Sequence, residues 1–558
     1  MLTARCGAGV GTLLRTSLPL VLACGALLAW VVMVYLENAR LLGDASLVAS
    51  DPPAHFVSGV LVYDYLWTAF GSNPLHFAES FYVRYPKVAI GHWPPVYYAV
   101  QAVWYGLFGT SPGVARALSA AVAAALAGLL FLRLRRGPSV SLAFAAAWAF
   151  LALPWVQRTA LEVMSDLLTG LFTFLALLAF ADLLDGRGKR AGGRFLVWSA
   201  LAVLTKGTAV ALGPFVLAAP LLAGRARCYR APWYWGGGLG LAAIGALFFL
   251  GAQVAGLAYP VTLGSLLRQM MSGKIAGAAV VAWWGSAPWP VFTLALVGFL
   301  DAAWARWRNR DQAPCTTDAL VAAAFVFAQG GFLLLSNLTH EPRAFLPSLA
   351  PLVVLAVRAV AALGRFLPVR VAATASVLAL SLAVVSGGRT PLNRVDGYAT
   401  AAAAIPYPDS GTLIVIGSDP PGEGAFIVER LVHDDRRAGV VLRGTSLLAE
   451  SDWMGTRSTL RFESPGQVRD WLLAQPVSHV VIDDSAKLGP DLQLLKDAVA
   501  GGTDFRLAGR YPVTDRLGVR QGELWIYENP AAAGRHPTMV RVRLGLDRSG
   551  RVLEYLWP

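Results

Sequence analysis

Charged residues are scarce in this chain of 558 residues: they make up 15% of it, whereas hydrophobic residues make up 56%. A typical soluble globular protein has about 25% charged residues. The mean hydropathy of +0.54 indicates the same imbalance. This shortage of charge excludes an ordinary soluble protein and predicts that much of the chain lies in a lipid bilayer.

Cysteine is also rare, and the few residues present have neither the spacing of a disulfide framework nor that of a metal-ligand set. The histidines show no i, i+4 pair beside a carboxylate, which is the pattern typical of a helical zinc site. We therefore expect no disulfide, no metal site and no bound cofactor. The four cysteines are Cys6, Cys24, Cys228 and Cys315.

The chain has no nucleic-acid-binding motif, although its formal net charge of +13 would suit such a partner. The arginines and lysines gather in short segments between apolar runs, for example at 133–136, 187–190 and 306–310. Such clusters are typical of the cytoplasmic loops of membrane proteins. We therefore expect no nucleic-acid partner.

Long apolar runs are present from Ser17 to Val385, and they then stop. Roughly 18 or more such residues cross a hydrocarbon core of about 30 Å. By this criterion we predict a polytopic α-helical membrane protein with about eleven transmembrane helices, the first of them a retained anchor. The predicted spans cover residues 17–36, 114–132, 139–156, 160–183, 194–206, 207–223, 233–256, 288–305, 318–336, 344–361 and 370–387.

One further apolar stretch, residues 94–109, decides the predicted orientation. It is short, rich in aromatic residues and begins with a proline pair, so it suits a helix that lies at the membrane interface. If it does not cross, every basic cluster falls on the cytoplasmic side with the N-terminus, as the positive-inside rule requires. We therefore predict a multi-pass protein of the plasma membrane with a long external loop over residues 38–113.

The last third of the chain has the pattern of a soluble domain. We predict a membrane domain over residues 1–388 and an external α/β domain over residues 389–558, with a partly parallel sheet. The glycines at 417–424 lack the spacing of a nucleotide-binding fingerprint. The expected strands lie at 412–417, 477–484 and 523–529, and the expected helices at 424–435 and 464–475.

Asp51, in the segment SDPPAHF, is the first candidate for chemistry. Pro52 and Pro53 fix their own φ angles and restrict the residue before each, so they limit the conformations of this loop. A carboxylate held in this way suits a general base. The plain alternative is a loop aspartate that begins a turn.

Two further groups of ionisable residues fall on the predicted external side. Glu162 and Asp166 are four residues apart at the start of an apolar helix, where they share a face or serve as helix caps. Lys206, in LTKGTAV, divides a long apolar run, and Arg343, in HEPRAFLP, begins another span. Both cations suit a lipid phosphate, although such residues also anchor helices at a membrane interface.

Taken in order, these features resemble the GT-C superfamily of membrane glycosyltransferases. Within it, the chain is similar to the branch of protein O-mannosyltransferases and of the bacterial transferase that adds aminoarabinose to lipid A. The resemblance covers about residues 15–390. The matching segments are SDPPAHF with Asp51, GHWPPVYY with Pro94 and Pro95, GTSPGVARALSA with Arg116, SDLL with Asp166, the TKG turn with Lys206, and RAFLP with Arg343.

The resemblance implies that a sugar moves, with inversion, from a polyprenyl-phosphate donor to an acceptor on the external face. Asp51 would be the general base, and Asp166 would orient the substrates or position Asp51. Pro52 replaces the glutamate that usually follows the first aspartate in this family. The acceptor therefore stays open among lipid, glycan and protein, and the sugar stays open too.

The donor phosphate would be bound by Lys206 and Arg343. Trp93 stands where the family often has a lysine, so Lys87 or Arg84 would take its place. The phosphate leaves with negative charge, which cations stabilise. We assign His55, His92 and Glu162 to contacts with the substrates.

Two other classes of function remain open. A polytopic transporter would place ionisable groups near mid-membrane and would break helices in corresponding halves of the chain. Lys206 marks one such break, and the second half of the sequence shows no matching one. A non-catalytic sugar-binding subunit of an envelope assembly would instead use the C-terminal domain as its binding module.

Overall fold

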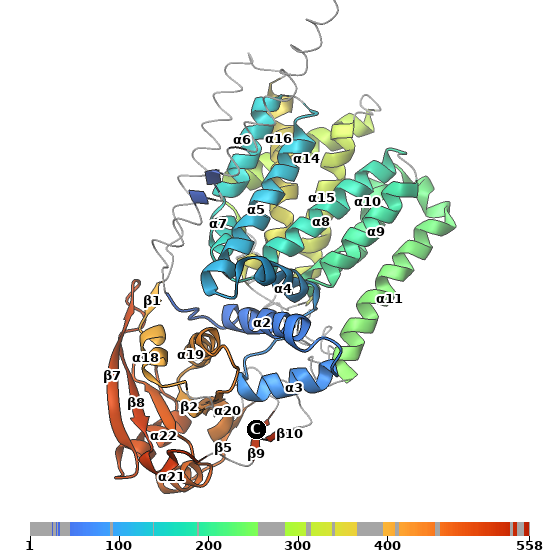
Figure 1. Ribbon diagram of the computed structural model, residues 1–558. Helices are drawn as coiled ribbons and strands as arrows, with labels where there is room; N and C mark the ends of the chain where they lie inside the picture. Colours follow the sequence, from blue (N-terminus) through green and yellow to red (C-terminus); the bar gives the residue numbers. More distant parts are fainter. Residues whose placement is uncertain are drawn as a thin grey trace, which may run out of the picture. The chain divides into compact units, whose positions relative to one another are not determined.

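The computed structural model of the chain divides into two compact units (Figure 1). Unit 1 comprises Met1–Leu36, Arg116–Gly251 and Pro260–Thr390, and unit 2 comprises Glu37–Ala115, Ala252–Tyr259 and Pro391–Pro558. Apart from a few residues between 25 and 33, the structure describes residues 45–89, 93–137, 139–186, 189–254, 285–308, 314–336, 341–364, 394–407, 412–451, 458–535, 539–543 and 552–556.

Unit 1 is a bundle of apolar helices, in which α8 packs against α9, α15 and α16, and α14 packs against α16 (Figure 1). Its elements are α5 (Pro112–Leu134), α6 (Val140–Ala152), α7 (Pro154–Ala160), α8 (Asp166–Leu184), α9 (Lys189–Val203), η2 (Gly207–Ala211), α10 (Leu212–Leu222), η3 (Ala226–Arg230), α11 (Pro232–Val254), α14 (Trp289–Trp307), α15 (Pro314–Ser336), η4 (Pro342–Phe345) and α16 (Leu346–Leu363).

Within the described residues, four helical stretches are long and apolar enough to cross a membrane: Pro112–Leu134, Asp166–Leu184, Thr316–Leu334 and Pro342–Leu363. The pair α6 and α7 makes a fifth if its 64° bend is counted within one span. Pro154 explains the bend, because the residue before a proline is restricted to extended backbone. The chain is thus a multi-pass membrane protein.

The predicted number of about eleven spans is not confirmed. The predicted spans 17–36 and 370–387 lie wholly or mostly outside the described residues. The predicted spans 194–206 and 207–223 correspond to α9, which has 15 residues, and to η2 with the 11-residue α10. Helices of these lengths are shorter than the roughly 20 residues that a perpendicular crossing needs.

Close approach of two backbones fixes α14 against α16. A Cβ atom at Gly298 would lie 1.9 Å from the carbonyl oxygen of Leu355, so only glycine fits there. Nearby along the same helices, Arg358 Nε donates to Asp301 Oδ2 over 2.6 Å. The ion pair and the glycine contact together define how these two helices align.

Unit 2 contains a six-stranded mixed sheet with the strand order β1-β7-β8-β6-β2-β3. Strand β2 runs parallel to β3 and β6, and β8 runs antiparallel to β6 and β7. The strands are β1 (Val395–Asp396), β2 (Leu413–Gly417), β3 (Val440–Arg443), β6 (His479–Asp483), β7 (Arg506–Asp515) and β8 (Gly522–Glu528), with two small two-stranded sheets of β4 (Ala449–Ser451) and β5 (Ser458–Leu460), and β9 (Met539–Arg543) and β10 (Val552–Leu556).

The helices of this C-terminal part begin at residues that the sequence marks clearly. The Asp419 side chain accepts a hydrogen bond from Gly422 N at the start of α19, and Ser464 accepts one from Gln467 N at the start of α21. The predicted strands and helices of an α/β domain with a partly parallel sheet are confirmed here. The helices are α18 (Tyr398–Ala404), α19 (Pro420–His433), α20 (Gly444–Leu448), α21 (Pro465–Ala474) and α22 (Pro490–Ala500), with η5 (Pro530–Ala532).

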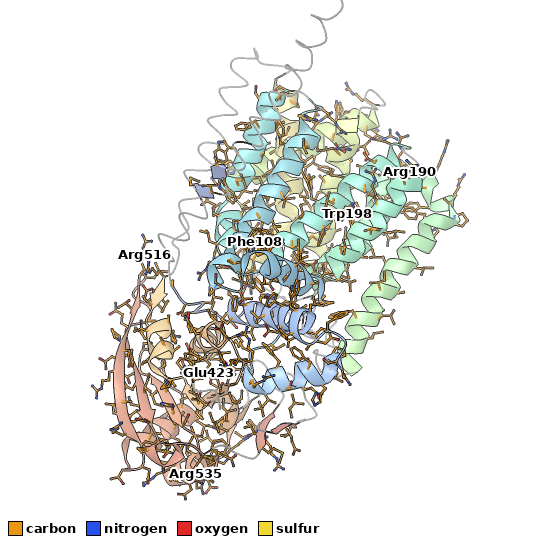
Figure 2. All side chains as sticks on the ribbon, in the orientation of Figure 1. Phe108, Arg190, Trp198, Glu423, Arg516 and Arg535 are labelled. Atoms are coloured by element: carbon orange, nitrogen blue, oxygen red, sulfur yellow. The ribbon has the colours of Figure 1, made fainter. Side chains whose placement is uncertain are left out.

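The first part of the chain contributes three helices to unit 2: α2 (Pro52–Thr68), α3 (Pro74–Arg84) and α4 (Val96–Phe108). Helix α2 packs against α4 and α19, and α3 contacts β3, β9 and β10. The predicted interfacial helix is α4, which has 13 residues and is too short for an ordinary span. Val103, Leu107 and Phe108 are exposed on it, which suits the predicted interfacial position. Phe108, the last residue of the helix, is labelled in Figure 2.

Candidate active site

Asp51 stands directly before α2 in unit 2. Its carbonyl oxygen accepts a hydrogen bond from His55 N over 3.0 Å, and Pro52 and Pro53 form the first helical positions. In the part of the chain that the structure describes, the Asp51 side chain makes no capping hydrogen bond to the helix. The proline pair therefore forms the start of α2 next to Asp51, and the rigid placement of the carboxylate stays a prediction.

His55 is buried between α2 and α4. Its Nδ1 lies 3.1 Å from the hydroxyl oxygen of Tyr98, and its ring centroid lies 4.5 Å from that of Trp93 and 5.4 Å from that of Tyr97. These contacts fix the orientation of the imidazole within an aromatic cluster. The predicted substrate contacts of His55 stay a prediction, and His92 lies outside the described residues.

Lys87 is buried in unit 2, and its Nζ donates a hydrogen bond to the carbonyl oxygen of Pro420 over 3.1 Å. Burial, together with a smaller contribution from the positive charge of Arg443, lowers the pKa of Lys87 from its ordinary value of 10.5 to about 7. The nearby carboxylates of Glu423, Asp51 and Asp419 oppose that decrease. The structure thus brings Lys87 within electrostatic reach of Asp51.

Arg84 is used differently from Lys87. Its Nε donates to the carbonyl oxygen of Ser80 over 3.2 Å, and its Nη1 donates to that of Arg437 over 2.7 Å. Both bonds go to backbone oxygens, which ties the end of α3 to the loop after α19. Of the two basic residues proposed to replace the lysine at Trp93, Lys87 is the one near Asp51.

In unit 1, Asp166 begins α8 and is 2% exposed. Its Oδ1 accepts a hydrogen bond from Lys206 Nζ over 2.6 Å, whereas its Oδ2 is buried with no hydrogen-bond partner among the described residues. A buried polar atom without a partner costs about 1–3 kcal/mol, so it marks a position for an incoming donor. The predicted carboxylate and the predicted lysine therefore form one pair.

The break in the helix at Lys206 is the one that the TKG turn predicts. Helix α9 ends at Val203, and η2 begins at Gly207, with Lys206 in extended backbone between them. Lys206 N still donates to Ala202 O over 3.1 Å, which closes the last turn of α9. The interruption directs the Lys206 side chain to the start of α8.

Glu162 and Arg343 complete the polar group in unit 1. Arg158 Nε donates to Glu162 Oε1 over 3.0 Å, and Arg343 pairs with Glu341 and lies 3.6 Å from Met164 Sδ. Burial raises the pKa of Glu162, while the charges of Arg158 and Arg343 oppose the increase.

The short helix η4, which carries Arg343, is held in place by two buried side chains. Gln329 Nε2 donates to Ala344 O over 2.7 Å, and Ser348 Oγ donates to Gln329 Oε1 over 2.6 Å. These bonds fix the backbone next to Arg343, so that its guanidinium can serve a ligand without reorganising the helix start. No local pattern in the sequence indicates this role of Gln329.

Reasoning from sequence also missed Glu423, Asp419 and Arg443, which surround Lys87. The stretch GSDPPGEG lacks the spacing of a nucleotide fingerprint, but its run Asp-Pro-Pro-Gly is typical of a helix start, and this is the signal that could have indicated these residues. At this helix start a Cβ atom on Gly422 would lie 2.0 Å from Ser418 Oγ and 2.7 Å from Asp483 Oδ2. Protein side chains thus fill the space in front of the helix.

These features define a class of protein: a multi-pass membrane protein whose helical unit carries a carboxylate and lysine pair at the start of a span, and whose second unit joins an aspartate loop to an α/β part. A family profile described as dolichyl-phosphate-mannose-protein mannosyltransferase matches residues 92–251. No curated protein matches the chain.

Solved structures extend the comparison over most of the chain. ArnT from Cupriavidus metallidurans, in its apo state, has a TM-score of 0.50 at 14% identity, with 91% of this chain and 98% of that chain covered. An oligosaccharyltransferase from Archaeoglobus fulgidus, in its apo form, has a TM-score of 0.49 at 13% identity, with 82% and 69% covered. The resemblance to the GT-C superfamily, and within it to the O-mannosyltransferase and aminoarabinose transferase branch, is confirmed.

Proposed function

We propose that the chain is a membrane glycosyltransferase that moves a sugar from a polyprenyl-phosphate donor to an acceptor on the external face of the plasma membrane. The observation that carries this proposal is the position of Asp51, directly before α2 and within electrostatic reach of the buried Lys87. The match to a family of dolichyl-phosphate-mannose-dependent transferases supports the choice of donor.

In the proposed reaction, Asp51 takes the proton of an acceptor hydroxyl while that oxygen attacks the anomeric carbon of the sugar. The bond between this carbon and the phosphate oxygen breaks, and the lipid phosphate leaves with the electron pair. Attack from the side opposite to the leaving group inverts the configuration. Asp51 then carries the proton, which it returns to water before the next turnover.

The developing negative charge on the phosphate calls for cations that are already in place. We assign this role to Lys206, Arg343 and Lys87. Asp166 holds Lys206 over 2.6 Å, and its second carboxylate oxygen can accept a hydrogen bond from a hydroxyl of the sugar or of the acceptor. His55, His92 and Glu162 remain proposed contacts to the substrates.

Substitution of the proposed base tests this function. We expect Asp51→Asn to lower transfer of sugar from a polyprenyl-phosphate donor by about 10²–10⁴-fold, because the amide cannot accept the proton. The assay uses the full chain in proteoliposomes, with product detected by mass spectrometry and folding checked by thermal unfolding. Transfer by Asp51→Asn at the rate of the unsubstituted protein would contradict the assignment.

The same preparation separates the two alternative functions. Uptake of a sugar or glycolipid into the proteoliposomes without any glycosylated product would favour a transporter. Binding of the donor without uptake or product, unchanged by Asp51→Asn, would favour a sugar-binding subunit. Comparison of the envelope lipids and glycans of a deletion strain with those of its parent would identify the acceptor, whether lipid, glycan or protein.

A further inference from the structure

The start of α19 lies directly against Lys87, although the two are 333 residues apart in sequence at the Pro420 carbonyl contact. A Cβ atom at Gly424 would lie 2.9 Å from Lys87 Cε and 3.0 Å from Pro53 Cβ. Any larger residue at position 424 would displace the lysine or the proline after Asp51. The absence of a side chain at Gly424 therefore lets α19 approach the Asp51 loop.

The charged residues at this helix start are themselves fixed by hydrogen bonds. Glu423, labelled in Figure 2, is fully buried, and its Oε2 accepts from Arg443 Nε and from Thr445 Oγ1, over 2.7 Å in each case. Its Oε1 accepts from Thr445 N over 2.8 Å. A carboxylate with this many donors keeps one orientation, so its charge acts on Lys87 from a constant position.

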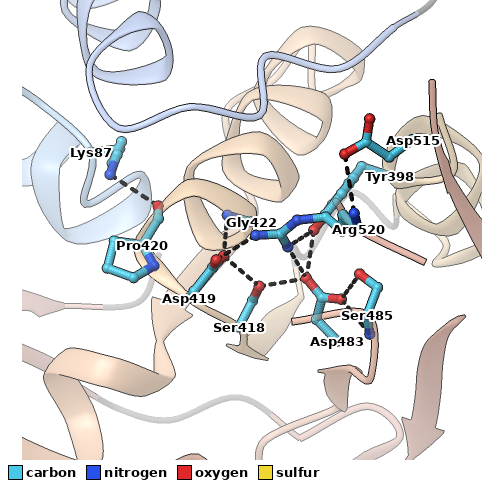
Figure 3. A network of polar contacts seen from close by, with 10 residues as sticks. All are labelled: Lys87, Tyr398, Ser418, Asp419, Pro420, Gly422, Asp483, Ser485, Asp515 and Arg520. Carbon is cyan, nitrogen blue, oxygen red and sulfur yellow. Dashed lines mark hydrogen bonds and ion pairs between the residues drawn. The ribbon is translucent and has the colours of Figure 1, made fainter. Parts of the chain in front are cut away.

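A second set of bonds connects Asp419 to the carboxyl end of strand β6 (Figure 3). Asp419 Oδ1 accepts from Gly422 N over 2.9 Å, and its Oδ2 pairs with Arg520. Arg520 Nη1 also donates to Asp483 Oδ2 over 2.9 Å, and Asp483 is the last residue of strand β6. Tyr398, Ser418 and Ser485 donate the remaining bonds to the two oxygens of Asp483. The helix start is thus attached to the sheet through buried polar contacts.

We propose that Gly424, Glu423 and Asp419 of the C-terminal α/β part are positioning residues for Lys87, and that they hold its side chain beside Asp51 to receive the donor phosphate. The inference rests on the proposed function, and it adds that the C-terminal part helps to build the phosphate site. A rigid scaffold that fixes a cation before the ligand arrives lowers the cost of binding and of charge development.

The pH dependence of donor use follows from the groups around Lys87. Only the protonated lysine attracts phosphate, so kcat/KM for the donor falls as pH rises through the pKa of about 7. Removing the Glu423 charge takes away an attraction that favours the protonated form and leaves the repulsion from Arg443. The fall then begins at lower pH. Asp51 and Asp419 are the other charged groups acting on Lys87. Both favour the protonated lysine and so oppose the decrease of its pKa.

Insertion of one methyl group tests the close contact. We expect Gly424→Ala to lower kcat/KM for the donor by about tenfold or more, because the new Cβ displaces Lys87 or Pro53. Alanine is a better helix former than glycine by about 1 kcal/mol, so the substitution does not weaken α19 by itself. Gly466→Ala in α21 is the matched control, since the nearest atom to its Cβ is Ser464 Oγ at 3.8 Å. Equal activities of the two variants would overturn the proposal.

Removal of the Glu423 charge tests whether this carboxylate favours the protonated form of Lys87. We expect Glu423→Gln to move the alkaline limb of kcat/KM to lower pH by about half a unit or more. Asp64→Asn is the control, because Asp64 joins α2 to Arg437 over 2.8 Å and does not act on Lys87. A loss of activity without a change of the limb, in both variants alike, would show a general structural role and would overturn the proposal.

Chemical labelling of Lys87 tests its placement by α19 independently of the proposed function, because the measurement needs no turnover. Competitive acetylation with acetic anhydride at several pH values, read by mass spectrometry of the Lys87 peptide, measures the pKa of this lysine in the full chain without turnover. Glu423→Gln must lower that pKa and Asp64→Asn must not, whatever the reaction is. If the labelling behaves so and the unsubstituted protein transfers no sugar, the proposed function fails while the placement of Lys87 by α19 stands.

Discussion

Both ends of α8 carry a buried carboxylate, but the two carboxylates differ in their hydrogen-bond partners. At the C-terminal end, Arg133 donates to Asp182 over 3.0 Å and to Asp318 through Nε over 2.7 Å. Arg194 donates to the other oxygen of Asp182 over 3.1 Å. These contacts join α5, α8, α9 and α15, and the side chains of Arg133, Asp182 and Asp318 are only 9–13% exposed.

At the N-terminal end, Asp166 has a single lysine as its partner, and one of its oxygens has no partner among the described residues. The charged side chains around it are more exposed to solvent than those at the other end: Arg158 is 46% exposed and Glu162 is 28% exposed. A fully shared buried network stabilises a fold, whereas an incompletely shared one leaves hydrogen-bonding capacity for a ligand. One end of α8 thus joins the helices of the bundle, and on the proposed function the other end takes part in the reaction.

The largest expected effect lies at the C-terminal end. Arg133→Met leaves two buried carboxylates, Asp182 and Asp318, without their main cation, and breaking such a pair costs about 3–5 kcal/mol in free energy of unfolding. Thermal unfolding in detergent measures this loss. Arg194→Met is the control, since its side chain is 55% exposed and it should cost less than about 1 kcal/mol. If Arg133→Met unfolds at the temperature of the unsubstituted protein, the stabilising role is wrong.

A smaller effect on stability, but a large one on activity, is expected at the N-terminal end. Asp166→Asn keeps the size of the side chain and a hydrogen-bond acceptor for Lys206, so the fold should lose much less than with Arg133→Met. We expect the transfer rate to fall by about 10²-fold, because the charge that orients Lys206 is gone. Rates and unfolding midpoints measured on the same samples decide the matter. A variant that loses stability but not rate would reverse the comparison.

The sequence predicts part of this arrangement, for physical reasons that differ between residues. Lys206 and Gly207 interrupt an apolar run, so the break in the helix could be predicted locally. Asp166 and Lys206 were each predicted, but their 2.6 Å contact joins residues 40 positions apart and depends on the packing of α9 beside α8.

Strands β2, β6 and β8 could be predicted because each is a compact run of apolar or aromatic residues. Strand β7, which lies between the two-residue strand β1 and strand β8, could not, because its residues are largely exposed and it lacks an apolar run. The residues that surround Lys87 could not be predicted from the sequence, for another reason. Glu423 and Arg443 reach it only after the sheet has formed, and no local pattern encodes that approach.

The smallest expected effect concerns Glu162 and its pH dependence. Its pKa in the folded protein is raised, so folding favours the protonated carboxyl, and the ionised form costs stability once pH exceeds the folded-state pKa. Glu162→Gln removes that cost and should raise the free energy of unfolding at pH 7 by less than about 1 kcal/mol. At pH 4 the difference should shrink, because the carboxyl of the unsubstituted protein is then mostly protonated. Unfolding curves at the two pH values measure it, and a larger gain at pH 4 would contradict the reasoning.

The contact between Lys87 and Pro420 also sets an order of events during synthesis. Pro420 lies 333 positions after Lys87, and the segment between them includes most of the membrane-spanning helices, so the lysine leaves the ribosome long before its partner exists. At about 5–20 residues per second, the interval is on the order of 15–70 s. During this time the Asp51 loop lacks the surface on which it finally rests. On the proposed function, the phosphate site around Lys87 is therefore complete only when the last third of the chain has been made and folded.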